Sequence, residues 1–219
     1  MTTTTQYLLK ARGIQIWRGE HLIVDDVDVC VSAGSIVQIQ GSNGSGKTTL
    51  LRALIGLAEI DDGEVFWQGQ SVSKVRDELY ASLLYLGHKP GITAGLTPFE
   101  NLTALCPELS NSEASDVQVK EQVLQVLSQL GIADRTDLPS AALSAGQQRR
   151  VSLARLQLQQ AMLWVLDEPL TSLDAEGQRW VKLQIEEHVT QGGAVVFTTH
   201  QPIDFDSHSV ISLNLASLS

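Results

Sequence analysis

A glycine-rich segment has the residue types and spacing of a phosphate-binding loop. Residues 41–48 read GSNGSGKT, which fits the pattern G-x-x-x-x-G-K-[ST]. Glycines let backbone N–H groups close around phosphate oxygens, and the positive end of the following helix points at them. Lys47 is expected to reach the β and γ phosphates, and the Thr48 hydroxyl to hold Mg²⁺. The residues predicted to contact the nucleotide in this segment are Gly41, Ser42, Asn43, Gly44, Ser45, Gly46, Lys47, Thr48 and Thr49.

Two acidic residues follow an apolar run further along the chain. Residues 162–166 read MLWVL and are followed by Asp167 and Glu168. In open α/β sheets, ligands gather at the carboxyl ends of strands. Asp167 suits a Mg²⁺ contact through water, and Glu168 can polarise an attacking water. An Asp-Glu pair after a strand is by itself more often a solvated loop or a helix cap, so the phosphate loop upstream is what favours the catalytic interpretation. His200 also follows a strand, residues 195–199, and is predicted to arrive near this site.

The elements around these residues alternate between strand and helix. Residues 35–40 are typical of a buried strand, and a helix is expected from about Lys47 to Ile55, where Gly56 is a stop signal. A strand, a glycine loop and a helix in this order form a phosphate-binding unit. Further along we expect a strand over 162–166, a helix over about 175–189, a strand over 194–198 and a last strand near 210–213. This alternation predicts an α/β fold.

The remaining parts of the chain have a different character. Short β-type runs at 15–17 and 27–31, separated by turn-like residues, suggest an antiparallel β-layer. The middle of the chain is expected to be mainly helical. Residues 116–130 carry apolar side chains at helical spacing, and Gly131 follows as a stop signal.

Five ordered motifs give the chain a resemblance to the ATPases of ABC (ATP-binding-cassette) transporters. They are the phosphate loop, the LSAGQQ segment at 143–148, the LDEP segment at 166–169, the SLD turn at 172–174, and the Thr-His pair at 199–200. The resemblance implies an α/β P-loop NTPase fold of ABC ATPase type. It further implies one domain over 1–219, with an antiparallel β subdomain and an α-helical subdomain that carries the signature at about 88–160.

The resemblance also implies a head-to-tail dimer in which two chains hold ATP between them. Ser144 and the backbone N–H groups of Ala145 and Gly146 are predicted to open a helix that runs through to Leu158, and such an end binds anions. By the family pattern this end serves the ATP of the partner chain. The residues carried over to that role are Ser144, Ala145, Gly146, Gln147 and Asp174. The resemblance also implies that Trp17 stacks on the adenine of ATP. A purely structural role for Trp17, in the core or on the surface, is an equal alternative.

Two departures from the general family pattern narrow the resemblance. Ala145 stands where a second glycine is usual, which requires a negative φ at that residue. His88 stands where most members carry a glutamine that contacts Mg²⁺ and the attacking water. His88 is therefore either a catalytic residue at that site or a residue that packs against the surface for a membrane partner.

Together with the segments at 38–44, 67–69 and 86–92, the alanine at 145 and the histidine at 88 resemble the ATP-binding subunits of bacterial cytochrome c maturation (haem exporter) complexes. That resemblance implies integral membrane permease partners and ATP hydrolysis coupled to haem export, or to release of haem-loaded periplasmic chaperone.

Composition excludes several other classes of protein. The formal charge of -10 on the 219-residue chain argues against nucleic-acid binding, which usually needs a basic face, although net charge does not exclude a local basic patch. An ABC protein acting on ribosomes or DNA is disfavoured because such proteins usually carry two cassettes, long coiled coils or basic insertions. Met1 to Gln6 shows no signal-peptide pattern, and no apolar stretch approaches the roughly 18 residues that span a bilayer. We therefore expect a protein of the cytosol whose membrane role comes through a partner, and the resemblance to the cytochrome c maturation ATPases implies peripheral attachment to the cytoplasmic face of the bacterial inner membrane. The remaining alternative is the ATPase subunit of another exporter or of a lipoprotein or lipid transporter.

Overall fold

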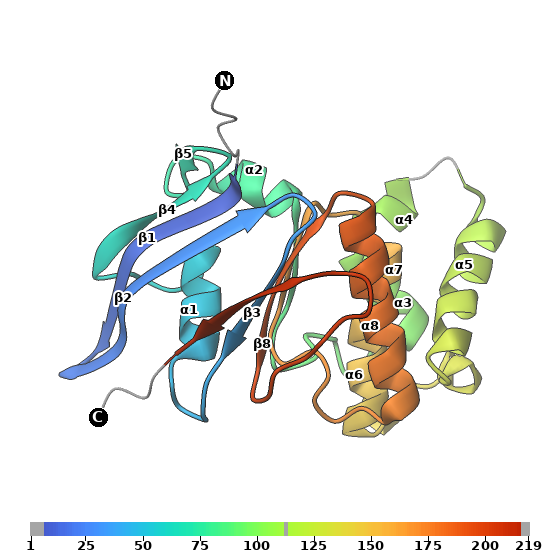
Figure 1. Cartoon of the computed structure of the whole chain (residues 1–219). Helices are drawn as coiled ribbons and strands as arrows, with labels where there is room; N and C mark the ends of the chain where they lie inside the picture. The colour runs from blue at the N-terminus through green and yellow to red at the C-terminus, as the bar shows by residue number, and fades with distance from the viewer. Residues whose placement is uncertain (1–6, 112–113, 216–219) are drawn as a thin grey trace. The chain divides into compact units, whose positions relative to one another are not determined.

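The computed structural model describes residues 7–111 and 114–215, and these divide into two compact units (Figure 1). The first unit comprises the chain up to Tyr85 together with Ala161–Glu168 and the residues from Ile185 onward. The second unit comprises Leu86–Gln160 and Pro169–Gln184. In the described parts of the chain, none of the helices has both the length and the apolar character needed to cross a membrane.

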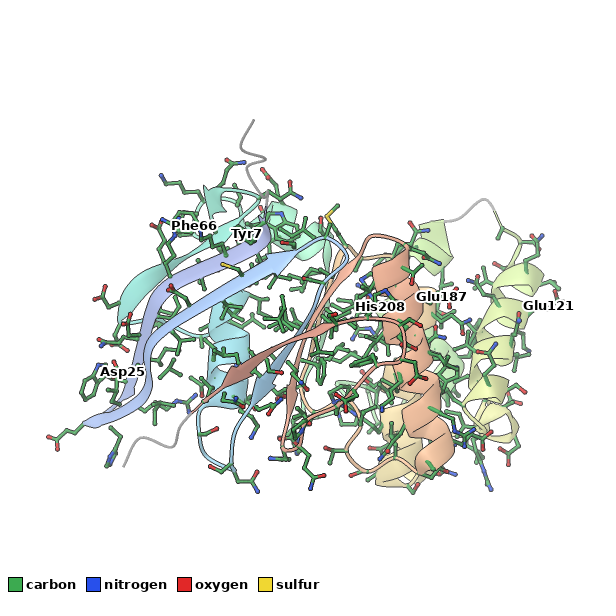
Figure 2. The ribbon with its side chains drawn as sticks, in the orientation of Figure 1. Tyr7, Asp25, Phe66, Glu121, Glu187 and His208 are labelled. Atoms are coloured by element: carbon green, nitrogen blue, oxygen red, sulfur yellow. The ribbon has the colours of Figure 1, made fainter. Side chains whose placement is uncertain are left out.

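The first unit contains a four-stranded antiparallel sheet in the order β2-β1-β4-β5. Strands β1 (Tyr7–Arg18) and β2 (His21–Ser32) form a long hairpin, and β4 (Asp62–Trp67) and β5 (Gln70–Ser71) follow on the other side. Figure 2 marks Tyr7 and Phe66 on the neighbouring strands β1 and β4, and Asp25 on β2. The sheet confirms the antiparallel layer predicted from sequence, although β1 and β2 are much longer than the two runs predicted within them.

A bulge explains why the length of β1 was missed. Leu9 and Ala11 are buried, and then Ile14 and Ile16 are buried, so the buried positions change from odd to even numbers within one strand. The pairing of β1 with β2 shifts register between Ala11 and Ile14, which is where this change occurs. Because a strand is recognised by strict alternation, a bulge in the middle divides its pattern into two weak halves.

The first unit also contains a five-stranded sheet in the order β6-β7-β8-β3-β9, in which β3 pairs in parallel with β8 and β9, and β7 pairs in parallel with β8. Its strands are β3 (Ile36–Gln40), β6 (Leu83–Leu86), β7 (Leu163–Leu166), β8 (Ala194–Thr199) and β9 (Val210–Asn214). Strands β7 and β8 are buried along their whole length, which suits a parallel sheet covered on both faces. Helix α1 (Lys47–Leu54) places Leu50, Leu51 and Leu54 in the core of this unit, and α2 (Arg76–Ala81) precedes β6.

The second unit is helical, as expected for the middle of the chain. Its helices are α3 (Pro98–Leu105), α4 (Pro107–Asn111), α5 (Asp116–Gln129), α6 (Ala145–Leu153), α7 (Arg155–Leu158) and the first part of α8 (Ala175–Thr190), with 3-10 turns at Ala133–Arg135 and Ser140–Ala142. Val123 and Leu127 of α5 pack with Val151 of α6 in one apolar core. Capping boxes begin α3, α5 and α6, so each of these helix starts is encoded within four residues.

One helix differs from the sequence prediction. The helix expected to run from the LSAGQQ segment through Leu158 is divided into α6 and α7 at Ala154. Ala154 keeps αR dihedral angles, and its N–H donates to the Arg150 carbonyl at 3.0 Å, so the helical path continues across the division. The strands β4 and β6 and the helices α2, α3 and α4 were not predicted as separate elements.

The burial of His188, which stacks on Trp164 in the first unit, is expected to make the stability of that unit depend on pH. The rings of Trp164 and His188 lie 3.9 Å apart at an interplanar angle of 5°, and burial lowers the pKa of His188 from 6.5 to about 4. Because the unfolded chain binds this proton at a higher pH than the folded chain, stability is lost as the pH falls from about 6.5 towards 4. We expect His188→Phe, which keeps a stacking ring but cannot titrate, to lose less stability over this range. Chemical denaturation of the two proteins between pH 7 and pH 4.5 would measure the difference. Identical pH profiles would contradict this role for His188.

Candidate functional site

The phosphate loop connects β3 to α1 and depends on glycines with positive φ. Gly41, Gly44 and Gly46 have φ angles of 157°, 84° and 90°. A Cβ atom added at Gly46 would lie 2.8 Å from Ile23 Cγ2 and 2.9 Å from the Ile23 carbonyl oxygen, whereas one added at Gly44 would meet nothing within 4 Å. Gly46 is thus required by both dihedral angle and space, and Gly44 by dihedral angle alone.

The Lys47 ammonium group is buried inside the curve of this loop. It donates to the Gly41 and Ser42 carbonyl oxygens at 2.8 and 2.9 Å, and it lies 3.3 Å from His200 Nδ1. Only 5% of Lys47 is exposed, so its charge is balanced by carbonyl dipoles and by the imidazole rather than by bulk water. The ammonium group therefore lies within the loop that is predicted to surround the phosphates.

A small network of oxygen atoms lies at the carboxyl ends of β7 and β8. Thr48 Oγ1 donates to Asp167, at 3.1 Å from Oδ1 and 3.0 Å from Oδ2. Thr198 Oγ1 donates to Asp167 Oδ1 at 2.6 Å. Asp167 is 1% exposed, and its carboxylate is therefore held by hydroxyl groups from α1 and β8. The structure thus brings together the Thr48 and Asp167 that the sequence predicted to share a site.

Glu168 and His200 also come into contact. Glu168 Oε1 lies 2.7 Å from His200 Nε2, and the Glu168 backbone N–H donates to Thr198 Oγ1 at 2.8 Å. Glu168 has a φ of 48°, a strained value for a residue with a side chain. A neutral imidazole with its proton on Nε2 satisfies both contacts of His200, because Nε2 then donates to Glu168 and Nδ1 accepts from Lys47. His200 therefore connects the lysine of the loop to the glutamate of the strand tip.

The residues present suit a triphosphate and a magnesium ion. The Ser45 hydroxyl in the loop is buried, and among the residues that the structure describes it has no hydrogen-bond partner. An orphaned hydroxyl beside Lys47 fits an acceptor such as a phosphate oxygen. Mg²⁺ prefers oxygen ligands and usually takes only one or two from the protein, which suits Thr48 and Asp167. Within the described ranges, no group of three or more His, Cys, Asp or Glu side chains could hold a metal by itself.

In the second unit, the signature residues form the start of α6. Ser144 Oγ accepts from the Gln147 backbone N–H at 3.3 Å, and Gln147 Oε1 accepts from the Ser144 N–H at 2.9 Å. Ala145 and Gly146 are the first two residues of the helix. N–H groups at this position have no carbonyl acceptor within the helix. Ala145 is helical and is not among the positive-φ residues, so this position accepts alanine in place of glycine.

Asp174 in the same unit has structural partners. Its Oδ1 accepts from the Gly177 N–H at 2.9 Å, near the start of α8, and its Oδ2 accepts from Arg150 Nη2 at 2.6 Å. The hydrogen bond from Gly177 and then the charge of Arg150 lower the pKa of Asp174, so its carboxylate stays ionised. Arg150 also donates to the Leu130 carbonyl at the end of α5, so it fastens three segments of this unit.

Trp17 and His88 are both exposed at the surface of their own units. Trp17 lies at the end of β1 with 44% of its surface exposed, and its backbone N–H donates to Asp61 Oδ2 at 2.7 Å. An exposed indole at this position rules out a place in the core. His88 follows β6, in a bend of the second unit. The roles assigned to these two residues from sequence stay predictions.

Thr198 is the main contributor to the site that the sequence interpretation missed. Its hydroxyl donates to Asp167 and accepts from the Glu168 N–H, so one side chain orients both acidic residues. The only available signal was its position two residues before His200 in a strand expected at the site. Tyr85 in β6 was also missed. Burial, and then the negative charge of Asp167, raise its pKa, which keeps the phenol protonated.

Comparison with known proteins agrees with this geometry. Residues 24–171 match the ABC transporter family. The chain is 41% identical to the cytochrome c biogenesis ATP-binding export protein CcmA of Vibrio vulnificus (strain YJ016) over 208 residues, which cover 95% of this chain and 99% of that protein. It is 45% identical to the CcmA of Pasteurella multocida (strain Pm70) over 197 residues, with 90% of each chain covered. An ABC transporter ATP-binding protein from Pyrococcus furiosus has the same fold, with a TM-score of 0.77 and 23% sequence identity. The match covers 94% of this chain and 96% of that protein.

These similarities bear out the resemblance drawn from the motifs, and with it the P-loop NTPase fold of ABC ATPase type. Proteins of this family bind ATP, and their ATP-binding subunits work as dimers with membrane permeases. The chain is accordingly an ATP-hydrolysing transporter subunit. It belongs to the ABC transporter family and, within that family, to the cytochrome c biogenesis ATP-binding export proteins known as CcmA.

Proposed function

We propose that the residues at the ends of β3, β7 and β8 bind Mg-ATP and hydrolyse it. The observation that carries this proposal is the contact set of one unit, in which Lys47 meets His200, His200 meets Glu168, and Thr48 meets Asp167. Residues Gly41 to Thr49 surround the phosphates, and Ser45 supplies its unused hydroxyl. Thr48 and Asp167 would hold Mg²⁺, which would neutralise charge on the phosphate oxygens.

In the hydrolysis step, a water oxygen attacks the γ phosphorus and the bond to the β–γ bridging oxygen breaks. Glu168 accepts a hydrogen bond from that water and so orients it towards phosphorus. Lys47 balances the negative charge that develops on the phosphate oxygens. The 2.7 Å contact of His200 Nε2 with Glu168 Oε1 holds the carboxylate in place. The Thr198 hydroxyl bonds both the Asp167 carboxylate and the Glu168 backbone N–H, and so fixes the position of both acidic residues.

We further propose that each ATP is shared between two copies of this chain. Ser144, Ala145, Gly146 and Gln147 at the start of α6 present N–H groups and a helix dipole suited to a phosphate. Asp174 is proposed to lie near the nucleotide of the partner copy, with its carboxylate steadied by Arg150. Trp17 is proposed to stack on the adenine, which its exposed ring permits. His88 is proposed to take the place of the usual glutamine beside Mg²⁺ and water, or else to face the membrane partner.

For the biological role, we propose ATP hydrolysis coupled to haem export, or to release of haem-loaded periplasmic chaperone, during cytochrome c biogenesis. The names of the CcmA relatives, at 41% and 45% identity over most of the chain, support this role. The chain would work as a peripheral protein at the cytoplasmic face of the bacterial inner membrane, bound to integral permease subunits of the haem exporter complex. The alternative is the ATPase of another exporter or of a lipoprotein or lipid transporter.

A cellular test separates these two roles. In a bacterium whose only copy of this protein carries Lys47→Ala, we expect c-type cytochromes to lack covalently bound haem, because the loop has lost its phosphate-binding charge. Haem staining of cytochromes after denaturing electrophoresis measures this, with the wild-type gene at the same locus as the control. Fully haem-loaded cytochromes alongside mislocalised lipoproteins would overturn the haem role in favour of the alternative.

A further inference from the structure

A glutamine is buried in the strand that leads into the phosphate loop. Gln38 lies in β3 with 3% of its surface exposed, between the buried apolar residues Val37 and Ile39. Its Oε1 accepts from the Ile203 backbone N–H at 3.1 Å, and its Nε2 donates to Ser212 Oγ at 2.9 Å. An apolar side chain would fill a central strand position without the cost of burying an amide. The buried amide therefore suggests that its hydrogen-bond partners, the Ile203 N–H and the Ser212 hydroxyl, need to be held in place.

The first of these bonds fastens the segment that follows His200. Ile203 lies three residues beyond His200, in a stretch without regular secondary structure. At its near end this stretch is held by Thr199, whose Oγ1 donates to the Gln201 carbonyl at 2.7 Å and accepts from the Gln201 N–H at 3.3 Å. Gln38 supplies the next attachment along the chain. His200 is thus bracketed between Thr199 on one side and the Gln38–Ile203 bond on the other.

His200 needs such support because its side chain is 39% exposed and its own contacts are polar. Its two ring nitrogens meet Glu168 Oε1 at 2.7 Å and Lys47 Nζ at 3.3 Å, and both contacts depend on ring position. A displacement of about 1 Å at a catalytic group can cost on the order of a hundredfold in rate. A backbone anchor three residues away is a direct means of limiting that displacement.

We propose that Gln38 is a positioning residue that holds His200 against Glu168 by fixing the backbone of Ile203. The proposal rests on the function proposed above for His200. The hydrogen bonds of the Gln38 side chain go to Ile203 and Ser212, and its effect on His200 would pass through the 200–203 segment. The separation of 165 residues between the two partners shows that this link belongs to the tertiary structure and not to a local motif.

The test is a double-mutant cycle between Gln38→Met and His200→Ala, measured as steady-state ATP hydrolysis by the full chain purified with its membrane partner. Gln38→Met keeps the side-chain volume and removes both hydrogen bonds. We expect kcat to fall about tenfold, the lower end of the losses seen when a group supporting a site is removed. The KM for Mg-ATP stays within about twofold, because the phosphate loop is unchanged. In the His200→Ala background, the same substitution has no further effect.

Two matched variants separate positioning from general packing. Ser212→Ala removes the bond to Gln38 Nε2 and leaves the bond to Ile203, so its kcat should equal that of the wild type. Gln38→Glu keeps an oxygen facing the Ile203 N–H, so it should retain most of the activity that Gln38→Met loses. If Gln38→Met does not fold, Ile203→Pro takes its place, because proline removes the same N–H with Gln38 intact.

The outcomes distinguish this inference from the function on which it rests. An equal fall in kcat on adding Gln38→Met to the wild type and to His200→Ala would overturn the positioning role while leaving His200 in the mechanism. Wild-type kcat for Gln38→Met would overturn it as well. Wild-type kcat for His200→Ala would overturn both the role of His200 and the inference from it. A tenfold loss that appears only in the protein that retains His200, and not in His200→Ala, would support the proposal.

Discussion

Glu168→Gln is expected to lower ATP turnover by about two to four orders of magnitude while ATP binding is retained. The amide has nearly the shape of the carboxylate, so the φ of 48° and the bond from the Glu168 N–H to Thr198 are kept. It loses the negative charge that makes the side chain a strong acceptor for the attacking water. The loop, Lys47, Thr48 and Asp167 are untouched, so bound ATP persists. Single-turnover hydrolysis and nucleotide retention on gel filtration measure the two effects.

The expected physical state of this variant follows from the same reasoning. If ATP joins two chains and is no longer cleaved, the Glu168→Gln protein should elute as an ATP-bound dimer. Glu187→Gln is the matched control, because Glu187 is an exposed residue of α8 in the same unit, labelled in Figure 2. It undergoes the same chemical change and should hydrolyse ATP at the wild-type rate. Near-normal turnover by Glu168→Gln would remove Glu168 from the mechanism.

Gly46→Ala is expected to abolish ATP binding and to destabilise the first unit, whereas Gly44→Ala is expected to leave the fold intact. Both glycines have positive φ, so each alanine costs about 1–2 kcal/mol in backbone strain. Only at Gly46 does the new Cβ also meet Ile23, at 2.8 Å from Cγ2 and 2.9 Å from the carbonyl oxygen. Because β2 cannot move away without breaking its ladder with β1, the start of α1 must shift and carry Lys47 with it.

Thermal unfolding and equilibrium ATP binding of the two variants provide the comparison. Gly44→Ala should lose only a few degrees in Tm, since the strain falls on a residue with open space around it. Gly46→Ala should show the larger loss of stability and no measurable ATP binding. Equal behaviour of the two variants would mean that the dihedral angle alone, and not the contact with Ile23, makes these glycines necessary.

Much of the site could be predicted from sequence because its parts are short and local. The strand, glycine loop and helix that hold phosphate are contiguous, from Ile36 to Leu54, and the capping box of α6 lies within Ser144 to Gln147. Each is determined by neighbouring residues through backbone dihedral angles and hydrogen bonds of short range. The acidic pair could be placed at a strand end because an apolar run stops directly before it.

Other features depended on which strands became neighbours. The order β7-β8-β3 places the carboxyl ends of three strands side by side, and this brings Thr48, Asp167 and His200 together from across the chain. The role of Thr198 arises from that pairing, since its hydroxyl faces Asp167 only when β8 lies beside β7. The bulge in β1 was similarly hidden, because it is determined by pairing with β2 and by burial of Leu9 and Ile14 on one face.

The sequence by itself determined the phosphate loop, the helix starts and the strand ends that carry acidic residues, because these depend on residues close together in the chain. Only the tertiary structure decided the contacts of Glu168 with His200, of His200 with Lys47 and of Gln38 with Ile203. Their partners are separated by 32, 153 and 165 residues along the chain. No periodicity or local propensity encodes such distances, and they form only when parallel strands pair in one particular order.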